Sequence, residues 1–233
     1  MEKVIVPLWK PDGVDPESFS QHLLGELAGI LSLDSAVLSL KMCIVDEYVA
    51  PAAGYRMESI LTPAWDAAII AWCHAGDNIL QHRANIEKYC DQFHAYIVTE
   101  SDRLPVDYSD VPLGHKSDGM NEIVALQKPD WLERDEWIRI WHESHTQIAI
   151  DTQSTYGYRQ NIVARALTAD APQVDAFIEE NFPEKAIHSR LGFYDVDSEE
   201  EKQERERIMI ESCARFIDFE KIDCTPTSEY ILK

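Results

Sequence analysis

The pattern of apolar and polar positions predicts the same order of strands and helices twice, before and after a proline-containing stretch near 105–112. In the first copy, an apolar run at 3–9 predicts a strand, and residues 16–31 have the spacing of a helix. The rest of this copy comprises strand patterns at 36–45 and 65–73, a charged helical stretch at 77–93 and a strand pattern at 95–99.

The second copy follows the same order from residue 121 onward. The stretch 121–127, with apolar residues at 123–126, predicts its first strand, and residues 133–150 have helical spacing. The remaining patterns predict strands at 155–167 and 186–194, a charged helix at 198–216 and a closing strand near 227–232. An internal repeat of this kind defines the architecture before any motif is considered.

A βαββαβ unit forms a four-stranded antiparallel sheet with two helices on one face, so its other face needs a partner. Two units in one chain can supply that partner internally. We therefore predict an α+β protein made of two fused ferredoxin-like halves, whose sheets face each other as a barrel-like body. The halves are residues 1–104 and 119–233, joined by a connector at 105–118.

Composition narrows the range of partners and compartments. The chain has 233 residues and a formal net charge of −21, which argues against nucleic acid or an anionic membrane as a partner. No apolar run is long enough to span a bilayer, and the first residues form a strand pattern and not a secretion signal. We expect a cytoplasmic protein. The five cysteines include no CxxC pair, so neither a zinc site nor a disulfide framework is predicted.

The segment with chemical content lies in the second predicted helix. Trp137, Trp141 and His145 are successive i, i+4 neighbours, so the imidazole borders a tryptophan-rich stripe. Burial beside apolar rings lowers the pKa of a histidine, which would leave a neutral base. The alternative is a core histidine with satisfied hydrogen bonds. The His142-x-x-His145 spacing has no third ligand nearby, apart from His188 as a remote candidate, and we predict no metal.

The strand pattern that follows adds further candidates. Tyr156, Tyr158 and Gln160 are every second residue and share one face of the predicted strand. Arg159 and Asn161 lie on the other face. A phenol such as that of Tyr158 could orient a carbonyl or phenolic substrate, and ordinary packing is the equal alternative. In the first copy, residues 55 and 56 lie in an insertion that could act as a lid.

The stretch from Trp137 to Asn161, WIRIWHESHTQIAIDTQSTYGYRQN, resembles the signature of the EthD-like proteins of the dimeric α/β-barrel superfamily. The similarity covers most of residues 119–233, with an apparent insertion around 168–185. In the first copy, aligning Phe19 with Trp137 places Leu23 and Leu27 at the other two stripe positions. The resemblance thus implies a pseudo-dimer with one functional cleft, in the second half.

The chain lacks GxGxxG, P-loop, GxSxG and HExxH motifs, and we predict no cofactor. The superfamily includes haem proteins, cofactor-independent oxygenases, isomerases, decarboxylases and cyclases, so the fold does not select a reaction. We predict a cofactor-independent acid–base enzyme of lyase, decarboxylase or isomerase type. Its substrate would be a small hydrophobic aromatic or carbonyl compound, as in aromatic compound catabolism.

The predicted roles are distributed over the second copy. His145 is the expected acid–base residue and Tyr158 the orienting hydroxyl, and the expected substrate-binding residues are Trp137, Trp141, Tyr156 and Asn161. Two other function classes stay open: a non-catalytic catabolic accessory or small-molecule-binding protein, and an EthD-like oxidoreductase. A further homodimer would have to use an outer surface.

Overall fold

The computed structural model describes all residues, 1–233. Its first half follows the predicted order, with a long first strand and a helical layer against it. The elements are β1 (Glu2–Trp9), α1 (Pro16–Gln21), η1 (His22–Leu27), α2 (Ala28–Leu33), β2 (Val37–Ile44), η2 (Ala50–Tyr55), β3 (Ala67–Cys73), η3 (Gly76–His82), α3 (Arg83–Tyr89), β4 (Gln92–Phe93) and β5 (Tyr96–Leu104).

The second half repeats this order. Its elements are β6 (His115–Lys116), β7 (Met120–Leu126), α4 (Arg134–Ile140), η4 (Trp141–His145), α5 (Thr146–Thr152), β8 (Gly157–Ala166), β9 (Ala176–Phe182), α6 (Glu184–His188), α7 (Arg190–Tyr194), α8 (Glu199–Cys213) and β10 (Ile222–Ile231). No helix is both long and apolar enough to cross a membrane.

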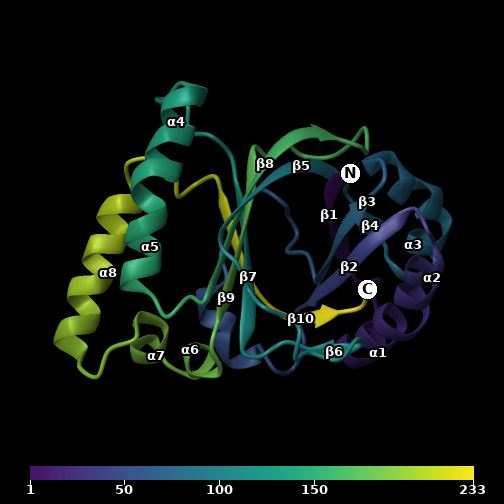
Figure 1. Ribbon diagram of the computed structural model, residues 1–233, viewed down its shortest axis with the longest axis horizontal. Coiled ribbons are helices and arrows are strands. Elements are labelled where there is room, and N and C mark those ends of the chain that lie inside the picture. The colour runs from purple at the N-terminus through teal and green to yellow at the C-terminus, as the bar shows by residue number, and fades with distance from the viewer.

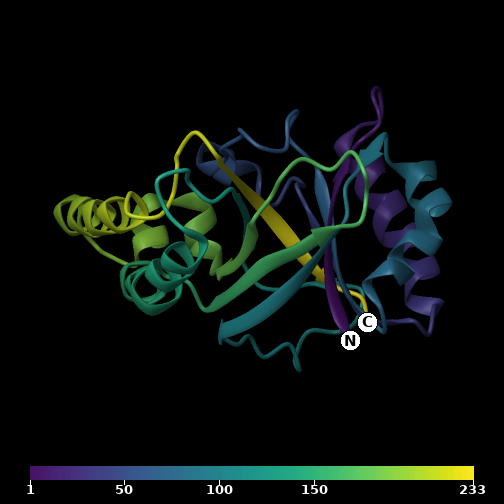
Figure 2. The same ribbon diagram turned by 90° about the horizontal axis from the view of Figure 1, so that it is seen from above.

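The strands close into one antiparallel barrel. Each half has the strand order of a ferredoxin-like sheet, β2-β3-β1-β5 in the first and β8-β9-β7-β10 in the second. The halves join because β5 pairs with β8 and β10 pairs with β2. Helices α1 to α3 cover one side of the barrel, and α4, α5 and α8 cover the opposite side (Figures 1 and 2). The predicted intramolecular closure of two ferredoxin-like halves is confirmed.

One strand prediction was wrong. Residues 186–194 form most of α6 and α7, and the strand of that position is β9, inside the stretch 168–185 that we interpreted as an insertion. The β9 sequence AFIEENF is difficult to recognise as a buried strand, because it contains two adjacent glutamates and an asparagine. All seven residues are buried, since one face meets the helices and the other faces the barrel interior.

Three hydrophobic clusters follow from this architecture. One packs α1 to α3 against the outer face of the first sheet, and a second packs the helices of the second half against the other sheet. The third combines residues from strands of both halves, among them Ile5, Tyr96, Ile123 and Phe177, and fills the barrel. Strands with both faces buried explain why β1 and β7 appear as nearly continuous apolar runs.

The remaining part of the barrel interior is charged and links the two halves. Lys3 forms an ion pair with Glu179, and Lys41 lies 3.1 Å from the same carboxylate and 2.7 Å from Glu229. Tyr108 of the connector donates to Glu229 at 2.8 Å. Buried charges persist only when they are paired and hydrogen-bonded, as these are.

The long helix of each half contains a π-helical turn at the same place. The amide of Ala28 donates to the carbonyl of Leu23, and the amide of Thr146 donates to that of Trp141, each five residues back. These positions are equivalent in the alignment of the two halves. π-Helical turns are rare and often occur near functional sites, which directs attention to the end of η4.

Candidate functional site

A cavity of about 200 Å³ lies between the outer face of the second sheet and the helices that cover it. Twelve of its 17 lining residues are hydrophobic. Its polar or titratable lining comes from β7, β9 and β10 on the sheet side and from η4, the end of α5, α7 and α8 on the helix side. These residues are Glu122, Glu180, Cys224, His145, Gln153, Arg190, Tyr194 and Cys213, with Tyr55 at the edge.

Two carboxyl groups face this cavity side by side. Glu122 on β7 and Glu180 on β9 are direct partners in the antiparallel register, which brings their side chains together on one face. They are only 7% and 6% exposed. Neither carboxyl group makes a hydrogen bond or an ion pair with the protein. Buried glutamates without partners are uncommon, because an unpaired charge is costly away from water.

The environment raises the pKa of both carboxyl groups. Burial raises the pKa of Glu122 to about 7, with the charge of Arg190 acting in the opposite direction. Burial also raises the pKa of Glu180 well above its usual range, and the neighbouring charge of Glu122 adds to this effect. Two carboxyls this close do not ionise independently. When Glu122 loses its proton above pH about 7, the pair therefore still holds a proton on Glu180.

His145 lines the same cavity from the helix side. It is 3% exposed, its ring lies 4.6 Å from that of Phe216, and its Nδ1 is 2.9 Å from Oγ of Ser212. Burial and the charge of Arg215 lower its pKa to about 3. The expected lowering of this pKa is confirmed in direction, and the imidazole is neutral at physiological pH.

The edge of the cavity combines aromatic rings from both halves. Tyr55 at the end of η2 donates to the carbonyl of Ala186 at 3.0 Å, and its ring centroid lies 5.2 Å from that of Phe193. The Arg190 guanidinium lies over the rings of Tyr55 and Phe193 at 4.9 and 5.3 Å, and over Tyr194 at 5.3 Å. A segment of the first half thus completes a cavity of the second half.

Three of the predicted site residues form a buried support beneath this cavity. Trp137, Trp141 and Tyr158 are fully buried. The indole of Trp141 donates to the Tyr158 hydroxyl at 3.0 Å, and that of Trp137 donates to the Phe216 carbonyl at 3.0 Å. Burial raises the pKa of Tyr158 well above its usual range. These side chains hold η4 and its histidine against the sheet, but they do not line the cavity.

The structure separates the other predicted residues from His145. Asn161 points into the barrel and donates to Glu179 at 3.1 Å. We expected Tyr156 to share a face with Tyr158, but β8 begins only at Gly157, and the Tyr156 hydroxyl instead donates to the Asp118 carbonyl at 2.7 Å. His188 ends α6, 3.1 Å from Glu184, and is not on a strand.

The equivalent layer of the first half contains no polar site. Val4 pairs with Ala71 where Glu122 pairs with Glu180, and Leu27 takes the position of His145. All three first-half residues belong to an apolar cluster. The two halves share an architecture and differ in the groups that could perform chemistry.

Sequence reasoning missed both glutamates. Glu122 lies in a fully buried strand, between Asn121 and the apolar residues that start at Ile123. Glu180 lies in the strand that we did not predict. Glu122 could have been identified from the sequence as a candidate site residue, because an acidic side chain on the core-facing side of a central strand is unusual unless it has a function. Its partner on β9 could not be found without the register.

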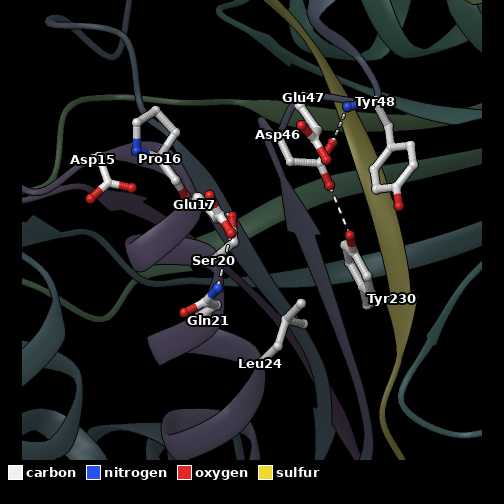
Figure 3. A pocket seen from close by; sticks show the side chains of 10 residues that line it. All are labelled: Asp15, Pro16, Glu17, Ser20, Gln21, Leu24, Asp46, Glu47, Tyr48 and Tyr230. Atoms are coloured by element: carbon white, nitrogen blue, oxygen red, sulfur yellow. Dashed lines mark hydrogen bonds between the residues drawn. The ribbon is translucent and has the colours of Figure 1, made fainter.

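A larger hollow of about 580 Å³ lies at the N-terminus of α1, beside the end of β2 (Figure 3). Three of its four acidic groups have partners: Asp15 accepts from the amide of Ser18 at 2.9 Å, Glu17 accepts from the Gln21 amide group at 3.2 Å, and Asp46 accepts from the Tyr230 hydroxyl at 2.8 Å. The fourth, Glu47, is exposed (Figure 3). Carboxylates with these partners and access to water have ordinary structural roles. We therefore place the candidate site at the Glu122–Glu180 cavity.

No family model matches the chain, and no curated protein matches its sequence. Solved structures match its fold. An anthrone oxidase-like protein has a TM-score of 0.54 at 10% identity, with 100% of this chain and 92% of that chain covered. A chlorite dismutase-type protein has a TM-score of 0.50 at 12% identity, covering 100% and 96%.

A chlorite dismutase variant from Candidatus Nitrospira defluvii, in complex with cyanide, has a TM-score of 0.50 at 10% identity and covers 98% and 90%. At such identities the similarity concerns the fold. The chain therefore has a dimeric α/β-barrel-type fold, with both ferredoxin-like halves in one polypeptide. Its resemblance to the EthD-like proteins stays a prediction.

Proposed function

We propose that the chain is a small-molecule enzyme that performs cofactor-independent acid–base chemistry in the cavity between the second sheet and its helices. The observation that supports this function is the Glu122–Glu180 pair, which is buried and has no protein partner. A group that only stabilised the fold would be paired or replaced by an apolar residue, as Val4 and Ala71 are in the first half.

The pair can supply a base and an acid at the same time. Glu122 is the better base, because the charge of Arg190 favours its ionised form, while Glu180 keeps the proton. In the proposed step, the Glu122 carboxylate removes a proton from carbon next to a carbonyl group. The electron pair of that C–H bond forms the C=C bond of an enolate, and the π pair of the carbonyl moves to its oxygen, which accepts a hydrogen bond from Glu180.

Return of the proton to another carbon completes an isomerisation, and departure of a leaving group with its bonding pair from the adjacent carbon gives a lyase. In a decarboxylase the C–C bond to a carboxylate breaks in place of the C–H bond, CO₂ leaves, and the carbon then takes a proton from the carboxyl pair. Such positioned proton transfer accelerates a reaction by about 10²–10⁴-fold. The apolar walls suit a hydrophobic aromatic or carbonyl compound, and the cavity volume of about 200 Å³ restricts it to a small one. Trp137, Trp141 and Tyr158 support the site from below.

The test follows deuterium from solvent into ligand. The full chain is incubated in D₂O with a panel of small aromatic ketones and phenols, and C–H exchange is measured by mass spectrometry and NMR. Exchange should depend on the basic form of Glu122, so its rate should rise with pH through about 7. A rise near pH 3 instead would assign the base to His145.

Glu122→Gln should reduce exchange by about 10²-fold or more. The matched control is Glu220→Gln, which changes an exposed glutamate outside the cavity and should leave the rate unchanged. Ligand binding without exchange or turnover would favour the non-catalytic binding protein. A product that has gained oxygen or lost two hydrogens would favour the oxidoreductase.

A further inference from the structure

The hydrogen bonds behind His145 determine which of its nitrogens carries the proton. Ser212 on α8 is 3% exposed, and its Oγ lies 2.9 Å from Nδ1 of His145. Arg215 donates to the same Oγ at 2.8 Å and to Oγ of Ser144 at 3.0 Å. Nε2 of His145 has no hydrogen-bond partner in the protein, and the residue lines the cavity.

A guanidinium can only donate, so Ser212 Oγ must accept from Arg215. The serine hydroxyl then has one hydrogen and one acceptor position left. If Nδ1–H of His145 donated to Oγ, the serine hydrogen would have no acceptor, because Oγ has no other partner. A buried hydroxyl hydrogen without an acceptor costs free energy.

The opposite arrangement satisfies every group. The Ser212 hydroxyl donates to Nδ1 of His145, which leaves the single proton of the neutral imidazole on Nε2. A doubly protonated ring is disfavoured, because burial and the nearby charge of Arg215 lower the pKa of His145 to about 3.

We propose that His145 is a neutral hydrogen-bond donor, which presents Nε2–H to an oxygen atom of the ligand in the cavity, and that Ser212 and Arg215 are positioning residues that hold this tautomer. The inference rests on the proposed function and changes the role expected for His145 from proton acceptor to donor. It narrows the ligand to a compound with an acceptor oxygen, such as a ketone, an enolate or a phenolate.

The donor lines the same cavity as the two carboxyl groups. Removal of a proton by Glu122 places negative charge on the carbonyl oxygen, and a donor positioned in advance stabilises that charge. A neutral imidazole is a much weaker acid than an imidazolium. It therefore keeps its Nε2 proton beside the carboxylates and can donate a hydrogen bond to the ligand. The charged and titratable groups that share the cavity with His145 are Glu122, Glu180, Arg190, Tyr55, Tyr194, Cys213 and Cys224.

The test is the tautomer of His145 in the free full-length protein. Histidine is labelled with ¹⁵N, and two-bond ¹H–¹⁵N spectra distinguish Nε2–H from Nδ1–H, with His145→Gln used to assign the signals. We expect Nε2 to be the protonated nitrogen from pH about 5 to 9, since the pKa lies well below this range. An Nδ1–H ring, or an imidazolium, would overturn the proposal.

Ser212→Ala should shift His145 toward a mixture of tautomers, and Ser212→Thr should restore the wild-type spectrum. The matched control is Ser144→Ala, which removes the other acceptor of Arg215 and leaves Nδ1 of His145 untouched. An unchanged tautomer in a folded Ser212→Ala protein contradicts the positioning role. If this variant does not fold, the wild-type spectrum alone decides.

The measurement needs neither substrate nor turnover, so it is independent of the exchange assay. A wrong tautomer together with deuterium exchange that depends on Glu122 would reject the donor role and leave the proposed function standing. The Nε2–H tautomer without any exchange would reject the proposed chemistry and leave the local proton assignment intact.

Discussion

Adjacent glutamates of β9 lie in opposite electrostatic environments. The two-residue period of a strand sends Glu179 into the barrel and Glu180 toward the helices. Burial would raise the pKa of Glu179, but the charges of Lys3, Lys41 and Arg159 outweigh it and hold the pKa well below its usual range. Glu180 has no such cation. Glu179 therefore stabilises the contact between the halves, whereas the unpaired Glu180 lowers the stability of the fold.

The raised pKa of Glu122, the partner of Glu180 in the pair, makes the stability of the fold depend on pH. The pKa of Glu122 is about 7 in the folded state and about 4.3 in the unfolded state, so the folded chain binds the proton more tightly. The free energy of unfolding should fall as pH rises between these values, by roughly 1.4 kcal/mol per pH unit from this residue. Glu122→Gln removes this contribution. It should leave stability nearly unchanged at pH 4 and raise it by about 3–4 kcal/mol at pH 8.

Urea unfolding at both pH values measures this difference. Glu220→Gln serves as the control, because it removes one negative charge from an exposed position outside the cavity. An identical pH dependence in the Glu122→Gln and wild-type proteins would mean that the carboxyl group ionises normally in the fold. A variant that gains stability and loses activity has the properties expected of a functional group.

At the scale of elements, the two long helices share a π-helical turn but present different residues to their sheets. In the first half the turn ends with Leu27 packed in an apolar cluster. In the second half it ends with His145 at a cavity. The common geometry belongs to the repeat, whereas the chemistry depends on individual substitutions within it.

This difference predicts opposite effects of two substitutions. Leu27→Ala should destabilise the chain by about 2–5 kcal/mol, because it leaves a cavity at a fully buried position. The exchange rate of the folded fraction should stay unchanged. His145→Ala should lower that rate while it affects stability less. Unfolding curves and exchange assays on the same samples measure both quantities, and equal activity losses without loss of stability would contradict the asymmetry of the halves.

At the scale of the whole molecule, the barrel closes through strand pairs that cross between the halves. β5 pairs with β8 and β10 with β2, and the ion pairs of Lys3 with Glu179 and Lys41 with Glu229 also join them. We propose that residues 1–104 and 119–233 are two units that evolved as halves of a dimer-like body, with 105–118 as the connector. The first half also closes the candidate site through Tyr55.

An isolated second half should therefore associate with itself. A chain of residues 119–233 exposes the edges of β8 and β10 and the apolar inner face of its sheet. Unpaired edges and apolar faces of this size favour pairing with a second copy. We expect a dimer or larger species by sedimentation and weaker resistance to urea than in the full chain. A stable monomer of this fragment would show that the halves fold independently.

Local patterning was sufficient to predict most elements and their tandem order, because side-chain spacing depends on neighbours in the chain. It also identified the stripe of Trp137, Trp141 and His145, since one helix determines which residues share its face. The prediction of β9 failed because two adjacent glutamates are not expected in a strand that is buried on both faces. They are buried in the structure, one against cations from distant strands and one at a cavity.

The sequence by itself determined the repeat, the two sheets and the need of each sheet for a partner, because these follow from local periodicity and from the burial of apolar faces. Only the tertiary structure decided that Glu122 lies beside Glu180, that Ser212 lies behind His145 and that Tyr55 reaches across from the first half. These contacts join residues 58, 67 and 131 positions apart in the chain. Strand register and helix packing bring these residues together, and neither can be predicted from the local pattern of apolar and polar residues.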